Sequence, residues 1–263
     1  MKNGQQEEGN VEEAEKVMLL KWSTLAMNSD KRQKREKAMT TIHKPKTPLQ
    51  AYMREGRIEA GADEAGRGPL AGPVAAAAVI LPSWVKSEDL PGLDDSKKMS
   101  AAQRKALVPK IKEVAVAWAI AECTAEEIDQ MNILRASIMA MHRAIRQLAP
   151  QPEFLLIDGN RFRPYYKDFE DQGAEIRLHD EKTLVPHECV VKGDGKYLSI
   201  AAASVLAKTW RDEVMERLDE EYPGYGWARN MGYPTREHYE ALRKLGPTPL
   251  HRKSFNLKLD ESE

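Results

Sequence analysis

Hydrophobic and polar positions follow two different periodicities between residues 57 and 256. Short apolar runs of the kind that form buried strands lie at residues 58–62, 74–81, 114–123, 154–157 and 188–191. Longer patterns of the kind that form helices lie at residues 125–148, 200–222 and 236–245. Thr124 and Glu127 have the spacing of a capping box at the start of the first helical pattern. This mixture predicts an α/β domain whose first two strands form a hairpin.

The first 56 residues have a different pattern and predict an extension that precedes the domain at 57–256. Residues 11–27 have the apolar spacing of a helix, and Pro45 and Pro48 mark a linker. Residues 1–16 carry five Glu against two Lys, whereas residues 17–57 carry ten Lys or Arg against three acids. Two interpretations stay open, a solvated and partly disordered extension or an arm that contacts a phosphate backbone. Residues 257–263 are expected to form a tail.

Composition narrows the class of protein only in part. A hydrophobic fraction of 41% over 263 residues is enough for an ordinary core, which excludes a disordered chain. Forty basic and 41 acidic residues nearly cancel, so the chain as a whole lacks the basic signature of a nucleic-acid binder. Cys123 and Cys189 lie far apart without zinc-ligand spacing, and the apolar run at 72–82 is too short to span a bilayer. We therefore expect a cytoplasmic protein without a membrane segment.

Four acids stand beside glycine-rich turns at the ends of predicted strands. Asp63 and Glu64 follow the first strand, Asp158 ends the fourth, and Asp194 lies between two glycines. Carboxylates drawn together from separate strands repel one another unless a cation neutralises them, and hard oxygen ligands suit Mg²⁺ or Mn²⁺. Such a cluster can support two-metal phosphoryl hydrolysis. The alternative is that each acid simply belongs to a turn, because Asp is common beside Gly in turns.

The stretch GADEAGRGPLAGPV at residues 61–74 resembles the N-terminal signature of the type 2 ribonuclease H family. Further segments follow in the order found in that family: DSKK at 95–98 with Ser100, LIDGN at 156–160, VKGD at 191–194, AAASVLAK at 201–208, GYPT at 232–235 and HRKSF at 251–255. The resemblance covers roughly residues 57–256. It implies a ribonuclease H-like mixed sheet flanked by helices, with a helical C-terminal part.

The resemblance also implies a role for each matching residue. The four acids Asp63, Glu64, Asp158 and Asp194 would hold two Mg²⁺ or Mn²⁺ ions. Gly66, Arg67 and Gly68 would recognise the 2′-hydroxyl and the phosphate at a ribonucleotide, because glycines allow close approach and arginine donates to phosphate. Tyr233 would stack on the sugar of the following deoxynucleotide, so that the site recognises an RNA-to-DNA junction. From the residues alone, Arg67 and Tyr233 could equally belong to ordinary loops.

Further candidates for substrate contact are the lysines and one serine near these motifs. Lys97, Lys192 and Lys208 are placed to contact phosphates, although most lysines are simply solvated. Ser204 and Lys208 are four residues apart on a predicted helix and therefore share one face, which is expected to look toward the active site.

Two departures from the family pattern are visible. Asp94 stands where the family usually has asparagine, which adds a negative charge near the expected phosphate track. The interval from Asp158 to Asp194 is long because residues 161–187 form an insertion that contains Tyr165, Tyr166 and Phe169. The insertion could be a structural hairpin or a flap that contacts substrate.

Together these features predict a metal-dependent endoribonuclease, expected to be a monomer. It would hydrolyse the RNA strand of RNA–DNA hybrids and cut 5′ of single ribonucleotides in duplex DNA, leaving a 3′-hydroxyl and a 5′-phosphate, in ribonucleotide excision repair. The alternatives are a type 3 ribonuclease H, a non-catalytic hybrid-binding protein and an unrelated DNA nuclease. The first has a folded N-terminal domain that this extension does not resemble, and the second would have no use for four carboxylates.

Overall fold

The computed structural model describes residues 48–168 and 181–258 of the chain. The chain divides after residue 47, and the unit that begins at Pro48 contains every element described below. The predicted helix at 11–27 and the charge segregation of the extension lie outside the described residues. Residues 48–56 contribute to the domain, because Gln50 pairs with Tyr197 and donates its backbone N–H to the carbonyl of Lys196 at 2.7 Å.

A five-stranded mixed sheet forms the centre of the molecule, which confirms the predicted fold class. Its strands are β1 (Glu59–Ala65), β2 (Val74–Ile80), β3 (Ala117–Cys123), β4 (Phe154–Asp158) and β7 (His187–Val190), in the order β3-β2-β1-β4-β7. β1 and β2 form the predicted antiparallel hairpin, and β2 pairs with β3 in the same sense. β4 lies parallel to both β1 and β7. The carboxyl ends of β1 and β4 therefore meet at one edge of the sheet.

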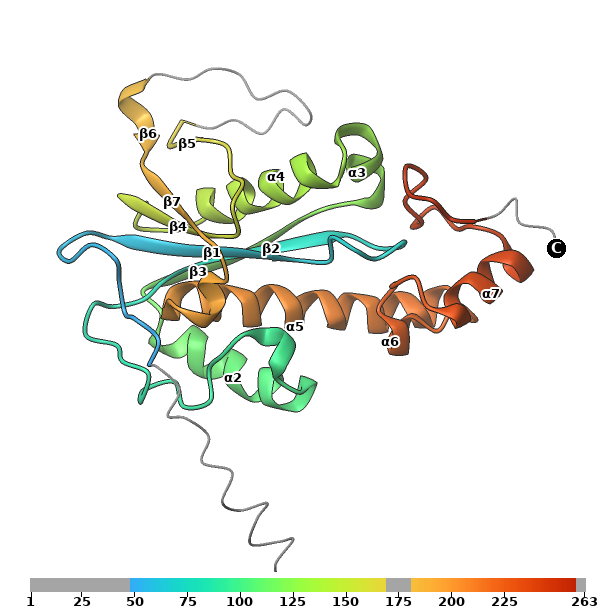
Figure 1. Cartoon of the computed structure of the whole chain (residues 1–263), viewed down its shortest axis with the longest axis horizontal. Coiled ribbons are helices and arrows are strands. Elements are labelled where there is room, and N and C mark those ends of the chain that lie inside the picture. The colour runs from blue at the N-terminus through green and yellow to red at the C-terminus, as the bar shows by residue number, and fades with distance from the viewer. Residues whose placement is uncertain (1–47, 169–180, 259–263) are drawn as a thin grey trace, which may run out of the picture. The chain divides into compact units, whose positions relative to one another are not determined.

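Helices cover both faces of this sheet (Figure 1). They are α2 (Ala101–Val114), α3 (Ala125–Met131), α4 (Ile133–Arg146) and α5 (Leu198–Glu221), followed by α6 (Trp227–Asn230) and α7 (Arg236–Leu245). α4 packs on one face and α5, with α2 against it, on the other. Along β2, Ala76 and Ala78 face the first layer, whereas Ala77 and Val79 face the second, as the period of two in a strand requires. Their small side chains let both helices lie close to the sheet.

The C-terminal part extends beyond the sheet along α5. α6 and α7 lie at the far end of this helix (Figure 1) and share a small core with it that includes Leu70, Met215 and Trp227. α7 matches the predicted helix at 236–245, and Thr235 caps it by accepting a hydrogen bond from the backbone N–H of His238. No helix among the described residues is long and apolar enough to cross a membrane.

Most elements agree with the sequence-based predictions, and three differ. The helix α2 was not predicted, although Ser100 and Gln103 form a capping box at its start. It takes up Val114, so the third strand begins at Ala117 rather than at residue 114. β1 continues to Ala65, which places Asp63 and Glu64 inside the strand rather than after it. The capping box of Thr124 and Glu127 is confirmed at the start of α3.

The ends of the 161–187 insertion form a small antiparallel sheet beside α4. Its strands are β5 (Tyr165–Tyr166) and β6 (Leu184–Val185), preceded by the short 3₁₀ helix η2 (Glu181–Thr183). Tyr165 is fully buried, and its ring lies 5.4 Å from that of His142 on α4. The ends of the insertion are therefore part of the core, as a structural hairpin requires. Phe169 lies outside the described residues, so the alternative of a substrate-contacting flap stays open.

Candidate active site

The four acids of the sequence prediction come from three neighbouring elements. Asp63 and Glu64 lie on β1, Asp158 ends β4, and Asp194 lies in the 3₁₀ helix η3 (Gly193–Gly195). The register pairs Ala62 of β1 with Ile157 of β4, so the residues that follow, Asp63 and Asp158, are neighbours across the two strands. These four residues are called the acidic cluster below.

A short hydrogen bond fixes η3 against the end of β4. The backbone N–H of Gly193 donates to Oδ1 of Asp158 at 2.7 Å. A Cβ at Gly193 would lie 2.5 Å from Cδ1 of Ile200 on α5 and 3.3 Å from Oδ1 of Asp158, so a side chain at this position would collide with α5 and crowd the end of β4. The glycine therefore brings Asp194 within range of the other acids.

Burial and mutual repulsion change the protonation of the acidic cluster. Asp63 is 5% exposed, and burial together with the charges of Glu64 and Asp158 raises the pKa of its carboxyl well above the ordinary value. Burial also raises the pKa of Glu64, against the opposing effect of Arg67. The pKa of Asp194 is raised by burial and by the charge of Asp158. The cluster thus holds more negative charge than its surroundings neutralise, which is the electrostatic condition for binding a cation.

Lys97 and Asp95 adjoin the cluster from the 3₁₀ helix η1 (Ser96–Lys98). Burial opposes the change, but the charges of Asp63 and Asp194, with those of other acids, raise the pKa of Lys97. Asp95 caps η1 by accepting the backbone N–H of Lys97 at 2.9 Å, and its carboxyl contributes to the raised pKa of Asp194. Asp95 was not among the predicted site residues. Its place directly before the Ser-Lys-Lys segment was the available signal.

The donor set of the cluster suits a hard divalent cation, because all four side chains offer carboxylate oxygens. In the part of the chain that the structure describes, no three His, Cys, Asp or Glu side chains lie close enough together to hold a metal ion by themselves. Because Mg²⁺ prefers octahedral coordination and usually keeps several waters, an ion bound here would also take oxygen ligands from water or phosphate.

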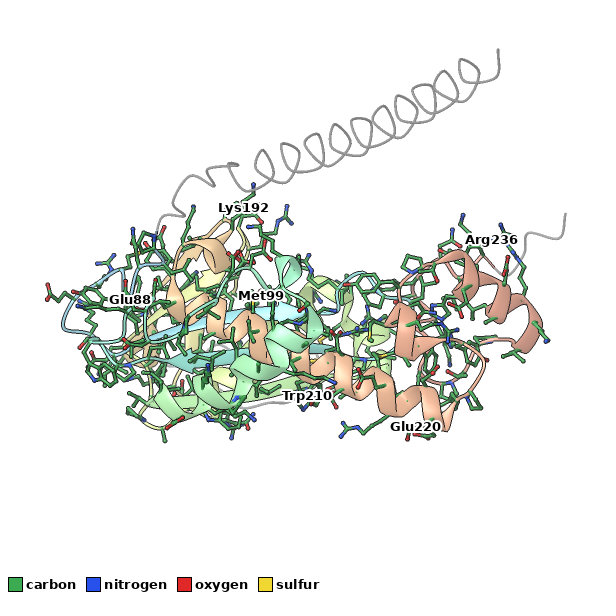
Figure 2. The ribbon with its side chains drawn as sticks, turned by 90° about the horizontal axis from the view of Figure 1, so that it is seen from below. Glu88, Met99, Lys192, Trp210, Glu220 and Arg236 are labelled. Carbon is green, nitrogen blue, oxygen red and sulfur yellow. The ribbon has the colours of Figure 1, made fainter. Side chains whose placement is uncertain are left out.

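A pocket of about 440 Å³ opens beside the cluster. Eight of the predicted site residues line it: Glu64, Gly66, Arg67, Gly68, Lys97, Ser204, Lys208 and Tyr233. Ser204 and Lys208 thus share the face of α5 that looks into the pocket. Lys192 does not line it and is instead exposed at the start of η3 (Figure 2).

The loop between β1 and β2, residues 66–73, forms one wall of this pocket and is called the glycine loop below. The side chain of Arg67 is half exposed and contacts Glu64, with 3.3 Å between Nη1 and Oε1. A Cβ at Gly68 would lie 3.3 Å from Cε1 of Tyr233, so the loop and the tyrosine ring are close neighbours. An exposed guanidinium beside bare backbone can contact both a phosphate and a sugar.

Tyr233 stands opposite this loop on a segment that buried side chains hold in place. Its carbonyl accepts a hydrogen bond from Nδ1 of His238 at 3.0 Å, since Trp227 donates its indole N–H to the other ring nitrogen of His238. Tyr233 is 41% exposed, and the ammonium of Lys208 lies 6.0 Å from the centre of its ring. The aromatic face is therefore available to a ligand.

Two further residues hold the glycine loop from below and were not predicted. Arg211 on α5 and Arg252 are both fully buried, and their guanidinium groups donate to carbonyls of the loop. Arg252 belongs to the recognised segment at 251–255 but received no role from it. For Arg211 the sequence offers no signal, because its partners in the glycine loop lie about 140 positions away.

Comparisons with known proteins agree on one family. The family model described as Ribonuclease HII matches residues 60–258. Ribonuclease HII of Parabacteroides distasonis is 56% identical over 209 residues, which cover 80% of this chain and 95% of the relative.

Solved structures show the same fold. The crystal structure of ribonuclease H2 from Pyrococcus horikoshii OT3 has a TM-score of 0.59 and 27% identity, covering 77% of this chain and 97% of the other. Bst-RNase HIII in complex with Mn²⁺ has a TM-score of 0.54 and 21% identity, with coverage of 83% and 73%. At that identity the second likeness concerns the fold alone.

Proposed function

The chain belongs to the ribonuclease HII family of endoribonucleases, and from this premise we propose that it cuts two kinds of substrate. The first is the RNA strand of RNA–DNA hybrids, which follows from the family. The second is duplex DNA that contains a single ribonucleotide, cut on its 5′ side to leave a 3′-hydroxyl and a 5′-phosphate. Such an activity would remove ribonucleotides from DNA.

The observation that carries this proposal is that one pocket joins an acid of the cluster to both recognition elements. Glu64, the glycines of the Gly-Arg-Gly segment and Tyr233 line the same space. A ribonucleotide lying on the glycine loop would present its 2′-hydroxyl to bare backbone, while Tyr233 would lie against the next sugar. Because the 2′-hydroxyl is the group that distinguishes RNA from DNA, this arrangement can select a junction between the two.

Asp63, Glu64, Asp158 and Asp194 would hold Mg²⁺ or Mn²⁺ ions. When bound, such ions would supply an activated water and would stabilise the charge that develops on phosphate and on the leaving oxygen. Since no three described acids suffice to hold an ion, oxygens of the substrate phosphate would complete the site. We therefore expect modest metal affinity in the free enzyme and tighter binding in the presence of substrate.

The remaining side chains of the pocket would orient the nucleic-acid backbone. Lys208 is fixed by a 2.7 Å contact with Asp212, which directs its ammonium over the pocket beside Tyr233. The hydroxyls of Ser204 and Ser96 lie 2.8 Å apart and hold η1 against α5. Lys97 would thus meet a phosphate near the acids, and Lys192 would contact the backbone outside the pocket.

The test compares cleavage of three labelled duplexes in Mg²⁺ or Mn²⁺: one with a single ribonucleotide, one RNA–DNA hybrid and one all-DNA duplex. Wild-type protein should cut the first two and leave the third. Asp63→Asn and Asp158→Asn should lose cleavage of both, while Asp89→Asn, which changes an acid in an exposed turn, should cut as wild type does.

Three results would contradict the proposal. An intact single-ribonucleotide duplex would remove the second substrate, and full activity in the Asp63 and Asp158 variants would remove the acids from catalysis. Cleavage of the all-DNA duplex would point instead to a general DNA nuclease.

A further inference from the structure

Two buried guanidinium groups lie beneath the glycine loop, and the hydrogen bonds described for them go only to backbone carbonyls. Arg211 and Arg252 are both 0% exposed. Buried charges are usually paired with an opposite charge, because taking an ion out of water is costly. An arginine surrounded by carbonyls instead fixes the course of the backbone that carries them.

Arg252 collects most of the carbonyls of the glycine loop. Its three nitrogens donate to the carbonyl oxygens of Gly66 (2.7 Å), Arg67 (3.2 Å), Pro69 (2.7 Å), Gly72 (3.0 Å) and Pro73 (3.1 Å). The loop therefore wraps around one planar, rigid donor group. With these carbonyls held inward, the outer side of the loop is left to face the pocket.

Arg211 joins this loop to the segment that carries Tyr233. Its Nε and Nη2 donate to Pro73 (3.0 Å) and Ala71 (3.2 Å) in the glycine loop, and its Nη1 donates to Met231 at 3.0 Å. Met231 is two residues before Tyr233. One guanidinium thus determines the distance between the two elements that would recognise the junction.

The glycine loop and the segment that carries Tyr233 are closely packed against each other and against Arg211. A Cβ at Gly66 would lie 2.0 Å from Nε of Arg211, and a Cβ at Gly232 would lie 2.7 Å from the carbonyl oxygen of Ala71. The backbone N–H of Leu70 also donates to the carbonyl of Gly232 at 2.7 Å. A shift of either segment would therefore require the other segment or the arginine to move.

Burying two guanidinium charges is costly, which indicates that Arg211 and Arg252 have a role beyond packing. Burial lowers the pKa of Arg252 to about 9, with a further contribution from the charge of Arg211, and burial lowers the pKa of Arg211 to about 10. Aliphatic side chains would fill the same volume without this cost. A guanidinium can hold carbonyls from two segments at a fixed distance, because its several N–H donors form a rigid fork.

We propose that Arg211 and Arg252 are positioning residues: Arg252 fixes the course of the glycine loop, and Arg211 fixes the separation between this loop and Tyr233. Together they would set the preference for a ribonucleotide followed by a deoxynucleotide. This inference rests on the proposed function. A single-ribonucleotide duplex needs both elements in register, whereas a continuous hybrid offers a 2′-hydroxyl at every position of the RNA strand. Loss of the fixed spacing should therefore harm the first substrate more than the second.

The test measures the ratio of kcat/KM on the single-ribonucleotide duplex to kcat/KM on the continuous hybrid, at one salt concentration. Arg211→Lys keeps the charge and has three N–H donors, but all three sit on one nitrogen. They cannot reach the three carbonyls that the separate nitrogens of the guanidinium reach. The ratio for this variant should fall about tenfold or more, as expected for a displacement of about 1 Å in a recognition element. Arg143→Lys is the matched control, because Arg143 is partly buried on α4, on the other face of the sheet, where it contacts Glu127 and the carbonyl of Glu122. Its ratio should stay within about twofold of wild type.

Gly232→Ala is the second variant and leaves both arginines unchanged. The Cβ of the new alanine would push the Tyr233 segment away from the glycine loop. The ratio of the two kcat/KM values should therefore fall, as it should in Arg211→Lys. Gly232→Ala decides the question if Arg211→Lys does not fold.

The two proposals fail differently. Wild type that does not cut the single-ribonucleotide duplex would overturn the proposed junction activity. Wild type that cuts it, together with variants that keep the wild-type ratio or lose both activities equally, would overturn the positioning role alone.

Discussion

Two clusters of like charge adjoin the glycine loop, and they differ in what neutralises them. The acidic cluster lies where β1 enters the loop, and among residues 48–168 and 181–258 basic side chains such as Lys97 offset only part of the repulsion that raises the pKa of Asp63. Arg211 and Arg252 lie beneath the loop, where backbone carbonyls occupy their donors. Under the proposed function, added cations would complete the first cluster, whereas backbone carbonyls of the chain itself accept the hydrogen bonds of the second. We infer that catalysis depends on added cations and that recognition does not.

The largest effect on stability is expected at the arginine pair. Arg252→Met should lower the free energy of unfolding by about 3 to 5 kcal/mol, because it leaves several buried carbonyls without a donor. Urea unfolding followed by circular dichroism measures this change. Arg236→Met removes an arginine that is exposed on α7 and should leave stability almost unchanged. Equal midpoints for Arg252→Met and wild type would mean that the carbonyls find other partners.

A smaller effect of opposite sign is expected in the acidic cluster. Asp63→Asn removes one of several crowded carboxylates and should raise the free energy of unfolding by roughly 0.5 to 2 kcal/mol, the usual size of a stabilising substitution. The measurement is urea unfolding in EDTA. Glu113→Gln, at an exposed position on α2, is the control and should change stability by no more than about 0.5 kcal/mol.

The pH dependence of this gain has a definite sign. The pKa of Asp63 is raised in the folded protein, so between its unfolded and folded pKa the native state binds more protons than the unfolded state. The stability of wild type therefore falls as pH rises through that window, and Asp63→Asn lacks this loss. The advantage of the variant should widen with rising pH and level off above the folded pKa. An advantage that shrinks as pH rises would be inconsistent with the raised pKa.

The smallest effect on stability is expected at Tyr233, which belongs to recognition but faces the pocket. Because the residue is 41% exposed, Tyr233→Ala should change the free energy of unfolding by less than about 1 kcal/mol. It should nevertheless lower kcat/KM on the single-ribonucleotide duplex about tenfold, the order of one lost stacking contact. Tyr233→Phe keeps the ring and should retain most of the activity. Equal losses in both variants would assign the effect to the hydroxyl instead.

The sequence was sufficient to predict the strands of the acidic cluster, for a physical reason. Parallel neighbours such as β1 and β4 present their carboxyl ends at the same edge, so acids at those ends must approach one another. Residues four apart on a helix share a face, which is why Ser204 and Lys208 could be assigned together. These relations depend only on the regular geometry of strands and helices, so they can be read from the sequence before the fold is known. Lys192 has no such partner on a helix face or strand end, and it lies outside the pocket that eight of the predicted residues line.

The parts that were not predicted depend on contacts between distant segments. Arg211 is a surface-type residue whose burial becomes understandable only when Ala71 and Met231 are seen around it. The helix α2 escaped prediction because its apolar positions are few and Pro109 interrupts the pattern, although the capping box at Ser100 was a usable signal. Hydrogen bonds from side chains to backbone carbonyls do not change the hydrophobic periodicity of the sequence, so that periodicity cannot predict them.

The most direct test of the separation between recognition and catalysis is a binding measurement without metal. Fluorescence anisotropy in EDTA, at one fixed salt concentration, compares the affinity of the protein for the single-ribonucleotide duplex and for the all-DNA duplex of the same sequence. Wild type and Asp63→Asn should both prefer the ribonucleotide without cutting it, Arg211→Lys should lose most of the preference, and added Mg²⁺ or Mn²⁺ should start cleavage only where the acidic cluster is intact. A preference that disappears for wild type in EDTA would show that recognition, too, requires the metal, and would contradict the account.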